Sequence, residues 1–206
     1  FYKLDINKNV NLILRIILKE KITHIVNFSA QSMVGQSWDN PIDWYNTNVV
    51  SQVKLHNQIR KFDFIKKYIH VTTPEVYGST DNWISENFNF SPSTPYAVSR
   101  ASCDLHLMSF KKAYDFPVVF TRAANVYGSG QQLYRIIPRT ILYSRLNKKL
   151  NLHGGGFSER SFIHIDDVAS ATFKIAIKGS IGETYHISTE RTISIHNLVL
   201  KVCEIL

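Results

Sequence analysis

Three short runs of β-branched and apolar residues, each followed by a polar loop and a helical pattern, restrict the possible folds of this chain more than any other feature. They cover residues 22–30, 68–73 and 118–122. Runs that are apolar at nearly every position are typical of strands buried on both faces, as in a parallel sheet covered by helices. The alternation therefore predicts an α/β fold with a doubly wound parallel sheet of the Rossmann type.

Helices are expected between these runs and after them, where apolar residues recur at helical spacing. Ser194 is expected to cap the last helix, and Gly154-Gly155-Gly156 to form a hairpin turn. The expected helices cover residues 10–21, 42–60, 95–114 and 133–146, and another ends at 178. Shorter strands are expected near 150–153, 161–164 and 184–188.

Charge and cysteine content exclude several functional classes. Lys and Arg number 24 against 16 Asp and Glu, a net charge of +8, but they are scattered in twos and threes. That scatter is typical of solvated helix ends, so we expect a small anionic ligand rather than a nucleic acid. Cys103 and Cys203 belong to no C-x-x-C motif, so we expect no metal site and a cytoplasmic location. No stretch approaches the roughly 18 apolar residues of a membrane span, so we expect no membrane partner.

Ligands of parallel sheets bind beyond the carboxyl ends of the strands, so the informative residues should follow the three runs. Glu75 follows the second run and is a candidate base, although a solvent-facing turn would have the same sequence. Tyr96 and Arg100 are four residues apart on an expected helix, so they share one face. A permanent cation beside a phenol favours the phenolate and would make Tyr96 a usable base, but an ordinary helix pair has the same spacing.

Three motifs occur together and in order: Thr73-Pro74-Glu75-Val76-Tyr77-Gly78, Pro95-Tyr96-Ala97-Val98-Ser99-Arg100 and Arg122-Ala123-Ala124-Asn125-Val126-Tyr127-Gly128. This combination resembles the extended short-chain dehydrogenase/reductases, and within them the nucleotide-sugar 4,6-dehydratases of the dTDP-glucose and GDP-mannose types. The likeness continues in Ser29-Ala30-Gln31-Ser32, in Ile136-Ile137-Pro138 and in residues 159–168, and so covers nearly the whole chain.

The resemblance implies catalytic roles for four side chains. Tyr96 would take the proton from the sugar C4 hydroxyl, with Arg100 standing where the family usually has lysine. Thr73 would orient the C4 oxygen. Glu75 would abstract the C5 proton once C4 is a ketone, since only then is that proton acidic enough to remove.

The resemblance also implies an NAD cofactor and a nucleotide-diphosphate sugar as substrate. The implied cofactor-binding residues are Asp5, Ile6, Ser29, Ala30, Tyr96 and Arg100. The implied substrate-binding residues are Gln31, Ser32, Asn125, Arg135 and Arg160. Of these, Arg135 either approaches the nucleotide base or is simply exposed at a helix start.

Three departures from the family pattern bear on activity. Arg100 keeps the charge of the usual lysine but cannot relay a proton. Pro74 stands where dTDP-glucose enzymes carry aspartate, so either another acid protonates the leaving hydroxyl or Glu75 handles both transfers. The family's G-x-x-G-x-x-G fingerprint, with the segment that reads the cofactor ribose, is missing from these residues. We therefore expect a fragment without the N-terminal βαβ unit, and no micromolar NAD binding to these 206 residues alone by calorimetry.

The sequence thus predicts a truncated dinucleotide-binding domain at residues 1–132 and part of a smaller substrate-binding domain at 133–206. The predicted function is an NAD-dependent nucleotide-sugar 4,6-dehydratase. One alternative is a 4-epimerase or UDP-glucuronate decarboxylase of the same superfamily, in which the role of Glu75 changes or vanishes. The other is a non-catalytic binding protein. The helices beginning near Ile42 and Pro95 could form a four-helix homodimer interface, as those of the family do.

Overall fold

The structure is a computed structural model that describes residues 1–80 and 82–206. It divides the chain into two compact units. The first comprises Phe1–Arg122 and Thr172–His186, and the second comprises Ala123–Ala171 and Ile187–Leu206. The chain therefore passes between the units three times, once in the middle of a helix. The expected domain boundary at residue 132 stays a prediction.

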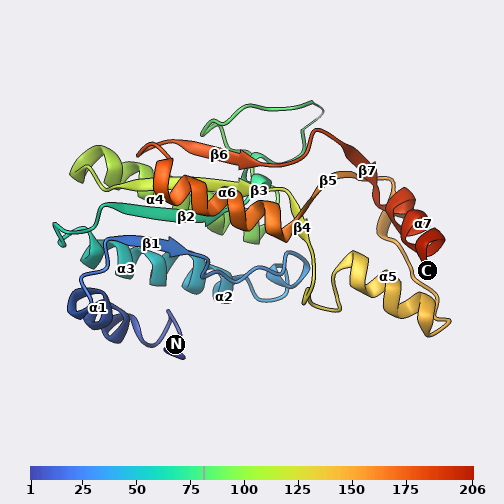
Figure 1. Ribbon diagram of the computed structural model, residues 1–206, viewed down its shortest axis with the longest axis horizontal. Helices are drawn as coiled ribbons and strands as arrows, with labels where there is room; N and C mark the ends of the chain where they lie inside the picture. Colours follow the sequence, from blue (N-terminus) through green and yellow to red (C-terminus); the bar gives the residue numbers. More distant parts are fainter. Residues whose placement is uncertain (81) are drawn as a thin grey trace. The chain divides into compact units, whose positions relative to one another are not determined.

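A four-stranded sheet in the order β1-β2-β3-β6 forms the frame of the first unit (Figure 1). Its strands are β1 (His24–Asn27), β2 (Lys67–Thr72), β3 (Val118–Ala123) and β6 (Thr184–Ile187). β1, β2 and β3 run parallel, and Tyr68 of β2 lies in register between Ile25 of β1 and Val118 of β3. The predicted parallel sheet is confirmed, and these three strands end at the same edge.

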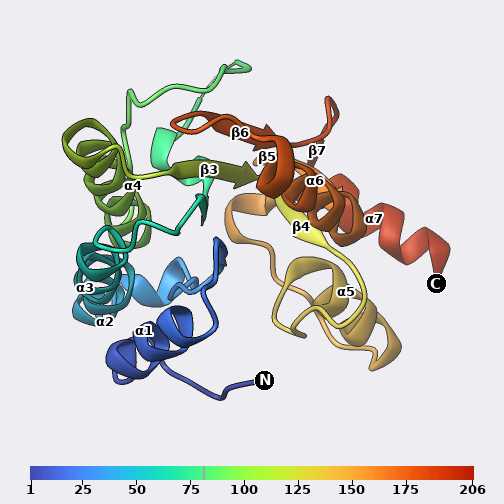
Figure 2. The same ribbon diagram turned by 60° about the vertical axis from the view of Figure 1, so that its left-hand side comes forward.

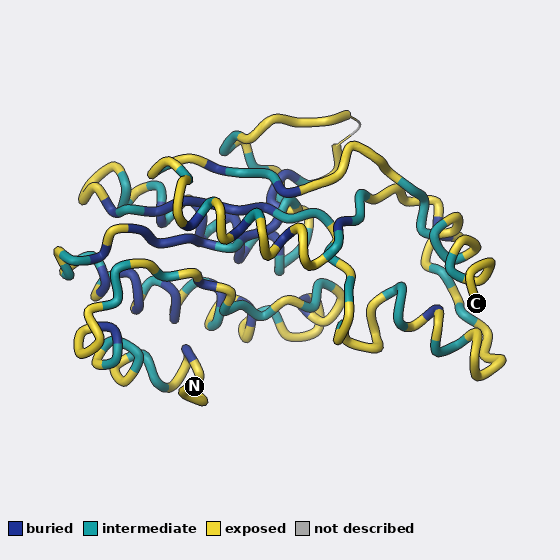
Figure 3. The backbone as a smooth tube through the Cα atoms, in the orientation of Figure 1, coloured by how far each residue is buried: buried dark blue, intermediate teal, exposed yellow. Residues whose placement is uncertain are grey.

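The helices that precede β3 in the chain pack on one another and on the sheet, with apolar side chains buried between them. These helices are α1 (Val10–Lys19), α2 (Pro41–Tyr45), α3 (Ser51–Ile59) and α4 (Pro95–Tyr114). α3 and α4 pack against each other beside the sheet (Figure 2). The core runs through the strands and the helix faces turned toward them (Figure 3), and includes Ile17, Leu55, Ile59, Tyr68, Leu107, Phe116, Val118 and Phe120.

The predicted helix over residues 42–60 is confirmed as a helical segment from Pro41 to Ile59, but it contains a π turn that the prediction did not include. The segment forms α2, then the π-helical turn η2 (Asn46–Val50), then α3. The π turn carries a fully buried asparagine, Asn48, whose amide bonds to groups outside the helix. Insertions of this kind into an α-helix are frequent at functional sites.

The second unit has a three-stranded sheet in the order β4-β5-β7. Its strands are β4 (Asn125–Tyr127), β5 (Glu159–His164) and β7 (Thr192–Ser194), and its helices are α5 (Ile136–Arg145) and α7 (Ile195–Ile205). β5 is parallel to β4 and antiparallel to β7, and α5 packs on α7. Ser194 caps α7 as predicted, because its hydroxyl oxygen accepts a hydrogen bond from the N–H of Asn197 at 3.1 Å.

The glycine triplet forms a turn, but the expected hairpin is wrong. Residues 153–156 make the short helix η4 (His153–Gly156), in which all three glycines have positive φ. Residues 150–152 form no strand, so no pair of strands is joined there. After β5 the chain continues directly into α6 (Ile165–Lys178), the helix that the two units share.

Across residues 1–80 and 82–206, every helix is too short or too polar to span a membrane. Within the same ranges, no group of three or more His, Cys, Asp or Glu side chains is placed to hold a metal ion.

Candidate active site

The first candidate groups lie where β2 ends. The strand leads through Thr73 into the short 3₁₀ helix η3 (Pro74–Tyr77). Thr73 is buried and caps η3: its hydroxyl oxygen accepts a hydrogen bond from the N–H of Glu75 at 3.3 Å. Glu75 itself is exposed. The Thr-Pro-Glu sequence thus places a carboxylate at the carboxyl end of a central parallel strand, the edge at which such sheets bind ligands.

Tyr96 lies in the first turn of α4. Thr94 caps this helix by accepting a hydrogen bond from the N–H of Ala97 at 3.1 Å. The N–H of Tyr96 donates to Ser37 Oγ at 3.2 Å, and its carbonyl accepts from Ser99 Oγ at 2.7 Å. The side chain of Tyr96 is half-buried. Its backbone is therefore fixed on both sides, while its ring retains contact with solvent.

η3 and α4 are held together by a small apolar cluster. Val76 and Tyr77 of η3 are buried in it together with Ala101 of α4, and Phe90 packs against them. The predicted residues Thr73 and Glu75 therefore belong to an element that packs on the helix carrying Tyr96 and Arg100.

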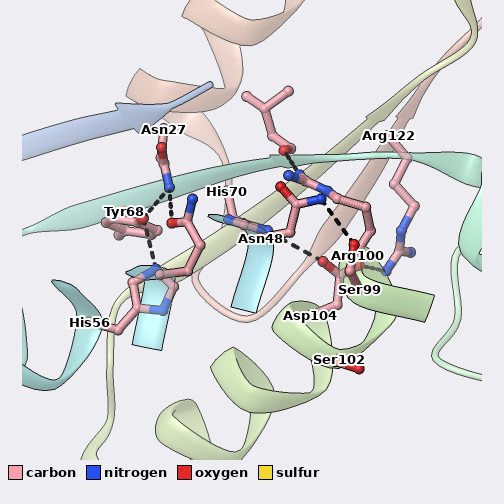
Figure 4. Close-up of polar contacts among 12 residues, drawn as sticks. Asn27, Asn48, His56, Tyr68, His70, Ser99, Arg100, Ser102, Asp104 and Arg122 are labelled. Carbon is pink, nitrogen blue, oxygen red and sulfur yellow. Dashed lines mark hydrogen bonds and ion pairs between the residues drawn. The ribbon is translucent and has the colours of Figure 1, made fainter. Parts of the chain in front are cut away.

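Arg100 lies one turn beyond Tyr96 and is 2% exposed. Its Nη2 donates to the backbone carbonyl of Val71 in β2 (Figure 4). Its Nε and Nη1 have no hydrogen-bond partner among the residues that the structure describes. The guanidinium thus links α4 to the sheet, and its expected service to Tyr96 stays a prediction.

A buried polar network fixes the segment after β1. Asn27 Oδ1 accepts hydrogen bonds from the N–H of Ser29 at 3.0 Å and from its hydroxyl at 2.5 Å. The Asn27 amide donates to Gln52 Oε1 at 2.7 Å and to the Tyr68 hydroxyl at 2.6 Å (Figure 4). Gln52 in turn donates to the carbonyl of Ser29 at 2.8 Å. Ser29 and the half-buried Ala30 that follows are therefore held in one backbone conformation at the ligand edge of the sheet.

Asn48 fixes the next residue, Gln31. The N–H of Gln31 donates to Asn48 Oδ1 at 2.8 Å, and its carbonyl accepts from Asn48 Nδ2 at 3.0 Å. The same amide donates to Ser99 Oγ at 2.9 Å, and that hydroxyl donates to the carbonyl of Tyr96. One buried side chain thus connects the segment after β1 to the first turn of α4. Ser32, the next predicted residue, is exposed.

The structure separates the side chains of Asp5 and Ile6. Asp5 is exposed and its carboxylate accepts a hydrogen bond from the N–H of Asn7 at 2.8 Å, whereas Ile6 is buried in the core. A polar groove of about 420 Å³ is lined by Asn7, the residue after Ile6, and by Gln31. Its other lining residues are Asp43, Asn46, Thr47, Val50, Ser51 and Lys54.

The other three predicted substrate residues belong to the second unit. Asn125 is exposed in β4, and its amide donates to the carbonyl of Ser161 at 3.3 Å. Arg135 is exposed at the N-cap of α5, and Arg160 is exposed in β5. All three therefore present polar side chains to solvent within their own unit.

Several buried titratable groups lie beneath the ligand edge and are kept neutral. Burial lowers the pKa of His56 well below its usual value, and the neighbouring His70 and His106 rings add to this. Burial also raises the pKa of the Cys103 thiol to about 12, against the opposing effect of Arg100. Cys103 is therefore a neutral packing residue rather than a nucleophile.

The sequence analysis missed the buried amides that arrange this edge. Asn27, Asn48 and Gln52 are each at most 8% exposed. The available signal was their position: each is a polar residue at an inward-facing position of an expected strand or helix. Buried polar groups need hydrogen-bond partners, so polar residues at inward-facing positions indicate a buried hydrogen-bond network.

Comparisons with known proteins agree with this arrangement. The family model described as GDP-mannose 4,6 dehydratase matches residues 1–205. The trifunctional UDP-glucose 4,6-dehydratase/UDP-4-keto-6-deoxy-D-glucose 3,5-epimerase/UDP-4-keto-L-rhamnose-reductase RHM2 of Arabidopsis thaliana is 32% identical, over all of this chain and 31% of its own length. The dTDP-D-glucose 4,6-dehydratase of Dictyostelium discoideum is 34% identical, over all of this chain and 50% of its own.

The fold also has solved counterparts. The crystal structure of dTDP-glucose 4,6-dehydratase from Bacillus anthracis in complex with NAD superposes with a TM-score of 0.88 and 32% identity. That match covers 99% of this chain and 63% of the crystallised chain. The chain therefore spans only one third to two thirds of the length of these relatives.

Proposed function

Because this chain belongs to the GDP-mannose 4,6 dehydratase family, we propose that it forms part of an NAD-dependent nucleotide-sugar 4,6-dehydratase. The observation that carries the proposal is the capped turn η3. It presents the exposed carboxylate of Glu75 at the carboxyl end of β2 and packs on the helix that carries Tyr96. A dehydratase needs a second base of this kind, whereas simple C4 epimerisation does not.

The residues present suit the nicotinamide end of NAD. Ser29 and Ala30 are small side chains on a backbone that Asn27 and Gln52 hold at the ligand edge of the sheet. In the proposed complex these two residues and Tyr96 border the nicotinamide, and Asp5 and Ile6 lie toward the adenine. Arg100 joins them in binding the ribose. NAD, when bound, supplies the reversible oxidation of the sugar at C4.

Tyr96 and Thr73 act in the first step of the proposed reaction. The Tyr96 phenolate takes the proton of the C4 hydroxyl while C4 is oxidised to a ketone, and the Thr73 hydroxyl donates a hydrogen bond to the C4 oxygen. The ketone makes the C5 proton acidic, because the electrons left on C5 can then delocalise onto the C4 oxygen.

Glu75 acts in the second step. Its carboxylate takes the proton from C5, and the C6–O bond breaks as a C5=C6 double bond forms. The proton that Glu75 has gained then passes to the departing hydroxide, so that water leaves and the carboxylate is restored. Pro74 has no proton to give, which is why both transfers fall to Glu75. The electron pair removed from C4 then reduces C6, and C5 takes a proton from solvent, which gives a 4-keto-6-deoxy sugar; the overall change is the loss of one water.

Three further assignments belong to the same proposal. Gln31, Ser32, Asn125, Arg135 and Arg160 bind the nucleotide diphosphate of the substrate. α3 and α4 form a homodimer interface, supported by the 51% exposure of Leu105 on α4; light scattering that gave the mass of a single chain would contradict it. The protein works in the cytoplasm, in keeping with its two free cysteines, Cys103 and Cys203.

The test replaces the base in the full-length protein. We expect Glu75→Gln to lower the formation of 4-keto-6-deoxy product by about 10²–10⁴-fold, the usual contribution of a general base. Oxidation at C4 should persist in this variant, and the ultraviolet absorbance of the reduced nicotinamide measures it. The matched control is Glu190→Gln, an exposed glutamate of the second unit. If Glu75→Gln retains turnover within a few-fold of the parent, the assignment of the base is wrong.

A further inference from the structure

The proposed function leaves unexplained a fully buried charged cluster in the first unit. Arg122 on β3 and Asp104 on α4 have side chains with no exposed surface, and Arg122 Nη2 lies 3.0 Å from Asp104 Oδ2. Arg122 Nη1 donates to the Tyr77 hydroxyl at 2.5 Å and to the carbonyl of Asn87 at 3.3 Å. The guanidinium also lies 5.0 Å from the centre of the Tyr77 ring. The side chains of Arg122 and Asp104 are both drawn and labelled in Figure 4.

Such a pair is a poor way to gain stability. The free energy needed to desolvate two charges is about as large as the attraction between them. A pair of apolar side chains of similar size often stabilises a fold equally well. Asp104 Oδ1 lies 3.4 Å from His70 Nε2, a second polar group in the core. A buried polar network of this size is therefore better explained by the geometry that it fixes than by its energy.

Tyr77 connects this buried cluster to the candidate base. It is the last residue of η3 and lies only two residues beyond Glu75. Besides Arg122, the Tyr77 hydroxyl lies 2.9 Å from His186 Nε2 and donates to the carbonyl of Asn87 at 3.2 Å. Tyr77 is thus held from three directions.

The backbone at the C-terminal end of η3 is also closely packed. Gly78 has φ +75°, and a side chain there would come within 2.2 Å of the carbonyl oxygen of Ser91. The N–H of Ser91 donates to the carbonyl of Val76 at 3.0 Å. With Thr73 capping the other end, the four-residue helix has little freedom except through the anchor of Tyr77.

We propose that Arg122, oriented by Asp104, is a positioning residue for the C5 proton transfer, and that it acts through Tyr77 to set the place of Glu75. This inference rests on the proposed function. Arg122 does not touch substrate; it fixes the turn that carries the base. A misplacement of about 1 Å in a reacting group can cost about 10²-fold in rate, so loosening this anchor should slow one chemical step selectively.

The test uses the full-length protein with dTDP-glucose and UDP-glucose, each prepared with deuterium at C5 or at C4. Tyr77→Phe removes the hydroxyl and keeps the ring. We expect kcat to fall about 10–100-fold with KM unchanged. We also expect the C5 isotope effect on kcat to rise above that of the parent, while the C4 isotope effect does not rise. Tyr185→Phe is the control, because it also removes one tyrosine hydroxyl, which accepts a hydrogen bond from the N–H of Ser180 at 2.9 Å.

Asp104→Glu provides a second variant that keeps the buried charge balanced but shifts the guanidinium, and it should show the same rise in the C5 isotope effect. Equal isotope effects in parent and variants, or a lower kcat without a larger C5 effect, would show that the cluster is only structural and overturn the inference. A parent enzyme that makes no 4-keto-6-deoxy product from either sugar nucleotide would overturn the proposed function as well.

Discussion

Replacing Asp104 by asparagine should destabilise the first unit strongly. The change keeps the shape of the side chain and removes the charge that faces Arg122, whose side chain has no exposed surface. The remaining acceptors of the guanidinium, the Tyr77 hydroxyl and the Asn87 carbonyl, are neutral. Breaking a buried ion pair by removing one partner costs about 3–5 kcal/mol, because the other charge stays buried.

Urea unfolding of the full-length protein, followed by circular dichroism, measures this cost. With a slope of about 1–3 kcal/mol/M, the midpoint of the transition that reports the first unit should fall by about 1 M or more. Replacing both partners, Asp104→Leu with Arg122→Met, should recover most of the loss, since an apolar pair leaves no charge unpaired. A loss below about 1 kcal/mol in Asp104→Asn would refute the reasoning, because it would mean that the guanidinium is not truly desolvated.

The same ion pair gives a pH dependence with a definite sign. Burial by itself raises the pKa of Asp104, but the neighbouring His70, Arg122 and Arg100 lower it by more, so the pKa in the folded protein is below the usual value. The unfolded carboxyl titrates near pH 3.9, so the stabilisation is complete above that pH and is lost as the pH falls through the folded pKa. Asp104→Asn should therefore flatten the fall in stability of the first unit in acid; an unchanged acid profile would contradict this.

The remaining predictions concern the ligand edge and the thiols. Asn48→Ala removes three hydrogen bonds, two of them to the backbone of Gln31, and should cost about 2–4 kcal/mol of unfolding free energy at about 1 kcal/mol each; a cost similar to that of Asn46→Ala, an exposed neighbour, would contradict the network. Because burial raises the pKa of Cys103 to about 12 and Cys203 is exposed, a thiol reagent at neutral pH should label Cys203 and spare Cys103 in the native protein; peptide mapping by mass spectrometry that finds the label on Cys103 would contradict this.

The parallel sheet of the first unit could be predicted because β2 and β3 contain short apolar runs. Tyr68–Ile69 and Val118–Phe120 are fully buried, as is typical of strands that are covered on both faces. The motif around Glu75 was predictable for a different reason. Residues that directly follow the strands of a parallel sheet lie at its ligand-binding edge, so the place of Glu75 in the sequence indicated its place in the fold.

The π turn at Asn46–Val50 could not be predicted from helical spacing. The segment is helical from Pro41 to Ile59 with or without the inserted residue, so a helical pattern predicts the helix and not the turn. What decides it is a tertiary contact, because Asn48 must reach Gln31 and Ser99, which lie 17 and 51 residues away. The role of Arg100 was hidden in the same way: spacing put it beside Tyr96, whereas its bond to Val71 depends on how α4 lies on the sheet.

The most direct test of the account is the identity of the product. Full-length protein incubated with dTDP-glucose and with UDP-glucose would be analysed by proton NMR of the sugar. The account predicts that the C6 hydroxymethyl signals disappear and that a C6 methyl signal appears. The product should also carry a ketone at C4 and one solvent-derived hydrogen at C5. A sugar that keeps its C6 hydroxyl and differs only in configuration at C4, or a substrate returned unchanged, would contradict the claim that Glu75 is the base of a dehydration.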